Sequence, residues 1–81
     1  MNAVDRLMEE QKAIGQRWND LRNETKAVFL EALRLGRKTK NGSAEAKIAA
    51  AAEISRAYAE LCDMDRCFLA DDRDEVLRLL A

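Results

Sequence analysis

Few side chains in this chain could act as nucleophiles or carry protons. The 81-residue sequence contains no histidine, and its only serines are Ser43 and Ser55. Ser43 follows a turn and Ser55 lies among small residues, and neither has a nearby basic side chain in the sequence that would activate its hydroxyl. General acid–base and nucleophilic catalysis both need such partners. We therefore expect a protein that is not an enzyme.

An enzyme can still be built from other polar groups inside a small helical bundle. In size and predicted helix content the chain resembles the all-α chorismate mutases, which use Arg, Lys, Glu and Gln side chains. Comparable groups occur here at Gln11, Arg17, Arg22 and Lys26. Only Gln11 lies on the apolar stripe described below, and the arginine spacing departs from the pattern of that family. The resemblance therefore implies no catalytic residue in this chain.

The two cysteines, Cys62 and Cys67, are the only candidate soft metal ligands. A spacing of five residues on a helix directs two side chains about 140° apart, so the thiols cannot easily pair or share one ion. The sequence has no C-x-x-C pair and no histidine to complete a zinc site. We expect free thiols, with Cys62 in a core, and neither a metal nor a cofactor.

Charge is distributed unevenly, although the net charge is only −1. Basic side chains concentrate between Arg34 and Lys47, and Arg37, Lys38 and Lys40 are candidate phosphate-binding residues. Their alternative role is to end a helix, where cations suit the negative end of the dipole. Acidic side chains concentrate from Glu60 to Glu75 and could face a basic protein surface. The small net charge makes nucleic acid the less favoured partner.

The elements that carry these residues are helices, and the first is the clearest. Apolar and small residues recur there at alternating steps of three and four: Val4, Leu7, Gln11, Ile14, Trp18, Leu21, Thr25, Val28, Ala32 and Leu35. We call this set the heptad stripe, because such spacing is typical of a helix that packs lengthwise on others. It predicts a helix over about residues 3–37. We expect Trp18 to be buried against a stripe of small residues on the next helix.

The rest of the chain predicts a turn and two further helices within a single domain, residues 1–81. Asn41-Gly42-Ser43 suits a turn over 39–43, and Ser43 is a good N-cap for a helix over about 44–69. The acidic run 71–75 interrupts the apolar pattern, and a short helix is expected over about 73–80. The alternative is one unbroken helix from Ala44. Short links place long helices side by side in opposite directions.

One segment of the first helix has more apolar side chains than a single face can bury. Leu30 and Leu33 point away from the heptad stripe, and Phe29 flanks it. The cover could come from the third helix, a second copy of the chain or a foreign protein. With polar neighbours forming a rim, the candidate partner-binding residues are Phe29, Leu30, Leu33, Arg34 and Arg37.

These patterns predict an all-α fold: an antiparallel helical hairpin with a short C-terminal helix, dimerising into a helical bundle. That architecture resembles the Rop-type RNA-binding hairpins, which implies a nucleic-acid-binding regulator as the alternative function. We favour a non-catalytic protein-binding module, a small adaptor or inhibitor of a larger protein. No apolar run reaches the ~18 residues of a transmembrane helix, and we expect a cytoplasmic protein without a membrane partner. Such a chain would suit a phage or a mobile element.

Overall fold

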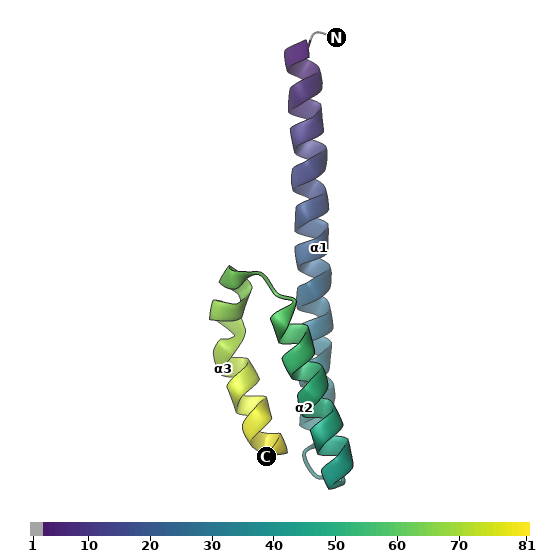
Figure 1. Cartoon of the computed structure of the whole chain (residues 1–81), viewed down its shortest axis with the longest axis vertical. Helices are drawn as coiled ribbons and strands as arrows, with labels where there is room; N and C mark the ends of the chain where they lie inside the picture. The colour runs from purple at the N-terminus through teal and green to yellow at the C-terminus, as the bar shows by residue number, and fades with distance from the viewer. Residues whose placement is uncertain (1–2) are drawn as a thin grey trace.

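The computed structural model describes residues 3–81, which form three α-helices. They are α1 (Ala3–Thr39), α2 (Ala44–Ala59) and α3 (Asp63–Leu80), and no strand occurs among the described residues. The predicted all-α class is therefore confirmed. In Figure 1, α2 runs back along the C-terminal half of α1, α3 lies beside them, and the N-terminal half of α1 extends alone. Across residues 3–81, no helix has the length and apolar character needed to cross a bilayer.

Local sequence explains where α1 ends and α2 begins. No proline interrupts residues 3–39, and Arg37 and Lys38 occupy the last turn of α1, where cations are favourable. The Gly42 N–H donates to the Thr39 carbonyl at 2.8 Å and closes the turn. Ser43 then caps α2, since its Oγ accepts a hydrogen bond from the Ala46 N–H at 3.1 Å. The turn returns the chain along the helix it has just left.

The predicted boundary between the second and third helices is wrong. The sequence pattern placed helices over about 44–69 and 73–80, whereas α2 ends at Ala59 and α3 spans Asp63–Leu80. No proline or glycine marks the break. Leu61 turns into the core, and Cys62 is extended (φ −68°, ψ 162°), with Asp63 and Asp65 in the first turn of α3. The acidic run continues α3, because its inner side contacts α2: the Arg73 guanidinium stacks on the Tyr58 ring.

The core lies where the three helices meet, around the C-terminal half of α1. Its buried side chains are Phe29, Leu33, Ile54, Ala57, Leu61, Val76 and Leu80. Gly36 allows this approach, since a Cβ there would lie 2.9 Å from both Ile54 Cδ1 and Val76 Cγ1. Close contact at Gly36 therefore fixes how tightly α2 and α3 pack on α1.

Candidate functional site

The heptad stripe lies on the surface of the chain, along the whole length of α1. Its aliphatic members stay exposed: Leu7 by 59%, Ile14 by 67% and Leu21 by 60%. Val28 and Leu35 are also exposed, although they lie in the half of α1 that α2 and α3 contact. The core uses a neighbouring face of the helix, which carries Phe29, Leu33 and Gly36. Helix α1 therefore has two apolar faces, of which only one is covered within the chain.

Beside the C-terminal half of α1, the heptad stripe forms one wall and the floor of a groove. The apolar lining of this groove comes from Ala27, Val28, Ala32 and Leu35 on α1 and from Ala46, Ala49 and Ala50 on α2, and its polar lining from Glu31, Thr39 and Glu53. We call it the α1–α2 groove. Alanine side chains are short, so another helix could approach both backbones closely. The shape and lining of the groove suit an apolar helix.

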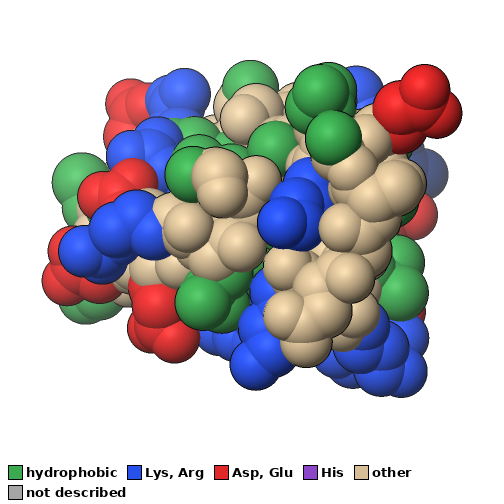
Figure 2. All heavy atoms as spheres, turned by 90° about the horizontal axis from the view of Figure 1, so that it is seen from below, with side chains coloured by type: hydrophobic (Ala, Val, Ile, Leu, Met, Phe, Trp, Pro, Cys, Tyr) green, Lys and Arg blue, Asp and Glu red, His purple; other side chains and the backbone are tan. Residues whose placement is uncertain are grey.

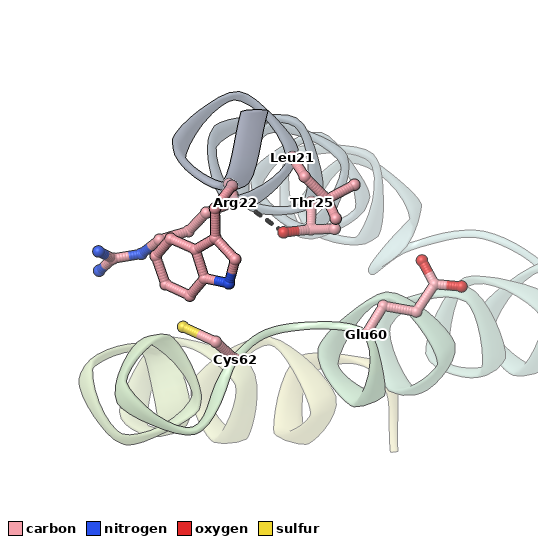
Figure 3. Close-up of a pocket in the computed structure, with 6 residues that line it drawn as sticks. Leu21, Arg22, Thr25, Glu60 and Cys62 are labelled. Carbon is pink, nitrogen blue, oxygen red and sulfur yellow. Dashed lines mark hydrogen bonds between the residues drawn. The ribbon is translucent and has the colours of Figure 1, made fainter. Parts of the chain in front are cut away.

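A second hollow continues the surface toward the N-terminus, at the level where α3 begins. It is lined by Trp18, Leu21, Arg22, Thr25, Glu60 and Cys62. In Figure 3, Cys62 and Glu60 face the α1 side chains across this hollow. The Thr25 hydroxyl donates to the Arg22 carbonyl at 2.9 Å, shown as the dashed line, so this polar member of the stripe is satisfied within its own helix. Members of the heptad stripe line both the hollow and the groove.

One ion pair holds α3 against the middle of α1. Arg22 donates from Nε and Nη2 to the two carboxylate oxygens of Asp65, at 2.9 and 2.7 Å. The Cys62 thiol also donates to Asp65, at 3.2 Å. Asp65 is only 3% exposed, and the hydrogen bonds from Arg22 lower its pKa from 3.8 to about 2. This pair fixes the start of α3 against α1.

The burial of two predicted partner-binding residues corrects that prediction. Phe29 and Leu33 are buried in the core, where α2 and α3 cover them. This leaves Leu30 exposed, with Arg34 bonded to Glu31 and with Arg37 at the surface. The cover for the excess apolar face is therefore the chain's own second and third helices. A single leucine with two arginines is a small surface for holding a partner.

Two further predictions about the first helix and the cysteines are also wrong in part. Trp18 is 53% exposed and lies beyond the end of α2, so the small residues of α2 do not bury it. Both thiols are free, but Cys62 is half-buried at the start of α3 and Cys67 is exposed.

The candidate phosphate-binding residues are brought together at the turn between α1 and α2. Arg37, Lys38 and Lys40 are all exposed there. Figure 2 looks onto this end of the molecule and shows several Lys and Arg side chains around it, with acidic ones among them. This end of the molecule, the basic tip, therefore has several basic side chains with acidic ones among them.

One exposed surface was missed in the sequence interpretation: the outer face of α3. Met64 and Phe68 lie one turn apart there and are exposed by 50% and 76%. Asp71 and Glu75 follow at the next turns on the same side and are exposed as well. We call these four residues the α3 face. The spacing of Met64 and Phe68 was the available signal, but the predicted helices over about 44–69 and 73–80 separated these two residues from Asp71 and Glu75, which α3 joins to them. Comparisons of this chain with family models, curated proteins and solved structures find no match.

Proposed function

We propose that this chain is a non-catalytic protein-binding module, a small adaptor or inhibitor, that works as a homodimer. In this proposal, α1 and α2 act as an antiparallel hairpin that joins a second copy in a helical bundle. The observation that carries it is the exposed heptad stripe, which runs the full length of α1. Large apolar surfaces of this kind mark contact sites in small proteins.

The chemistry of the stripe favours a protein chain over a small molecule. Its hollows are open and shallow, and aliphatic side chains repeat along them at a helical spacing. Small-molecule sites are enclosed, and a few polar groups in them point toward one ligand. An amphipathic helix matches a heptad-spaced surface over its whole length.

The larger partner is proposed to bind at the α3 face. Phe68 and Met64 supply an exposed aromatic and a flexible thioether, the kinds of side chain that dominate protein interfaces. Asp71 and Glu75 next to them favour a partner with a basic rim. We place this complex in the cytoplasm, and a phage or mobile-element origin fits a small inhibitor of a host protein.

Substitutions on the two surfaces separate the two contacts. Light scattering at micromolar concentration should give a dimer mass for the wild type, a monomer mass for Ile14→Asp and a dimer mass for Ile48→Asp. Ile48 is a matched control, since it is 70% exposed but outside both surfaces. The wild type, Ile48→Asp and Phe68→Asp are then each immobilised and incubated with native host extract. The wild type and Ile48→Asp should capture a host protein that Phe68→Asp does not. A folded monomer whose wild-type bait captures nothing specific would overturn the proposal.

The basic tip supports a nucleic-acid-binding regulator as the second candidate. The exposure of Arg37, Lys38 and Lys40 at one turn favours it. Neutralising all three residues should then abolish RNA or DNA binding, and wild-type affinity should fall steeply with salt as counterions are released. We expect wild-type binding to be weak, because acidic side chains elsewhere bring the net charge to −1. Tight, salt-sensitive binding that the triple variant loses would favour this candidate instead.

A further inference from the structure

We infer that the heptad stripe is covered by a second copy of the chain running antiparallel, so that the N-terminal half of each α1 fills the α1–α2 groove of the other copy. This inference rests on the proposed function, in which the stripe is a protein-binding surface. It adds the direction of the partner, the register of the contact and the reason why one copy alone leaves the groove open.

The placement of the helices provides the first argument. Helices α2 and α3 lie beside the C-terminal half of α1 only, and the N-terminal half projects without a neighbour (Figure 1). The stripe from Val4 to Trp18 and the stripe from Leu21 to Leu35 each span 14 residue steps, about 21 Å at the usual rise. In an antiparallel pair, the stripe from Val4 to Trp18 of each copy lies on the stripe from Leu21 to Leu35 of the other. Each copy then completes the groove of the other, as a two-fold symmetric interface requires.

Side-chain sizes match in this antiparallel register. About a two-fold axis between Trp18 and Leu21, the facing pairs are Val4 with Leu35, Leu7 with Ala32, Gln11 with Val28, Ile14 with Thr25, and Trp18 with Leu21. Three of the five pairs join unlike residues, large against small or polar against apolar; Val4 with Leu35 joins two aliphatic residues, and Trp18 with Leu21 joins two large apolar ones. Such alternation fills the space between helices without voids. Leu7 would enter the groove where Ala32 and the α2 alanines leave room.

A parallel pairing packs less well. It would place Trp18 on Trp18 and Ala32 on Ala32, which overfills one layer and leaves a void in another. It gains one Gln11 pair, which can form hydrogen bonds across the interface. At the flanks it brings Arg17 next to the partner's Arg22, whose guanidinium is already bonded to Asp65. The sizes of the facing side chains thus favour the antiparallel direction.

The antiparallel direction gives one attraction and one repulsion between the flanking charges, and it suits Thr25 among the polar members of the stripe. Arg17 lies close to the partner's Glu24, and this attraction occurs twice in the dimer. Glu10 approaches the partner's Glu31, whose carboxylate is already bonded to Arg34. The Thr25 hydroxyl is satisfied by the Arg22 carbonyl, so its methyl group can face Ile14 without an unpaired polar atom.

Cysteine cross-linking tests the direction. Three proteins are made in a background with Cys62→Ser and Cys67→Ser: the background alone, Leu7→Cys and Ala32→Cys. Circular dichroism checks that each is folded, and light scattering gives its mass. After mild oxidation, a covalent dimer should form when the Leu7→Cys and Ala32→Cys proteins are mixed and allowed to exchange. Neither protein alone, nor the background, should form one. In the wild-type background, Ile14→Asp should also lose the dimer mass, while Ile48→Asp keeps it.

Each alternative outcome has a distinct meaning. Covalent dimers formed by each single-cysteine protein alone would mean a parallel dimer, which overturns the inference and leaves the proposed function in place. A dimer mass with no cross-link in any combination would place the interface elsewhere and also overturn it. A folded monomer at every concentration would overturn the inference as well. The protein-binding part of the proposed function would then fail too unless a host protein is captured by wild type and lost by Phe68→Asp.

Discussion

The two halves of α1 carry the same heptad stripe, but only the C-terminal half also has a core face. In that half, Phe29 and Leu33 are buried by α2 and α3. The positions seven and fourteen residues before Leu33 are Lys26 and Asn19, which are polar. The N-terminal half thus has the exposed heptad stripe and no core face. The difference teaches that one helix can carry a buried face and an exposed apolar face of different lengths, and that the shorter, buried face sets the size of the core.

Truncating the largest apolar side chain in each half of α1 should show the difference between the halves most clearly. We expect Phe29→Ala to lower the free energy of unfolding by about 3–5 kcal/mol, the range for a fully buried large aromatic. Trp18→Ala should cost less than about 1 kcal/mol in dilute protein, because the indole is half exposed in the single chain. Urea unfolding followed by circular dichroism at several protein concentrations measures both. Only the Trp18→Ala loss should grow with concentration; equal losses at all concentrations would contradict the distinction.

The ion pair where the two halves meet should make stability depend on pH. Because Arg22 lowers the pKa of Asp65 to about 2, the folded state favours the carboxylate, and its stabilisation is present above the ordinary value of 3.8. That stabilisation should be lost as the pH falls from about 3.8 toward 2. Asp65→Asn should be less stable than wild type at neutral pH, by less than Phe29→Ala, and its stability should change less over this acidic range.

Thermal unfolding at neutral pH, pH 4 and pH 2 measures this effect. The control is Glu53→Gln, which removes an exposed ion pair with Arg56 and leaves Asp65 untouched. Exposed pairs contribute little and are screened by salt. A Glu53→Gln protein that loses the acid dependence as completely as Asp65→Asn would show that Asp65 is not its source.

Replacing the glycine in each half of α1 by alanine should have opposite effects on the free energy of unfolding. At Gly36 the new Cβ would lie 2.9 Å from Ile54 and Val76, and overpacking of about 1–3 kcal/mol should outweigh a helix-propensity gain of about 1 kcal/mol. At Gly15 nothing lies within 4 Å, so Gly15→Ala should stabilise dilute protein by up to about 1 kcal/mol. The urea concentration at the unfolding midpoint shows whether each substitution stabilises or destabilises the protein. Stabilisation by both substitutions would mean that α2 and α3 do not pack closely on α1.

Local sequence signals were enough to predict the helical class, the long first helix and the Ser43 cap. Each depends on residues close in sequence: the heptad spacing, the absence of proline and the Asn41-Gly42-Ser43 turn. The choice of buried face was not predictable in this way. Both faces of α1 near Phe29 are apolar, and the heptad stripe was expected to pack against the next helix. Contacts with Ile54, Val76 and Leu80 select the other face, and these residues are distant in sequence.

The break after Ala59 shows the same limit. Residues 60–62 contain no helix breaker, so local propensity continues the helix. Distant contacts decide otherwise: Arg22 binds Asp65, which lies 43 positions away, and the Tyr58 hydroxyl donates to the Arg66 carbonyl at 2.8 Å. The α3 face was missed for this reason, because the wrong boundary divided its four residues between separate predicted segments.

The unbroken course of α1 from Ala3 to Thr39 also affects how the projecting half stays helical. Starting a helix in water is unfavourable, whereas adding a residue to an existing helix costs little. The turns around Phe29, held by α2 and α3, act as a permanent nucleus from which helical order extends toward the N-terminus. In the proposed dimer, a second copy would meet a surface that is already ordered and would lose less conformational entropy on binding. Melting the packed half would remove the nucleus, so the projecting half of α1 and the core should lose their structure together.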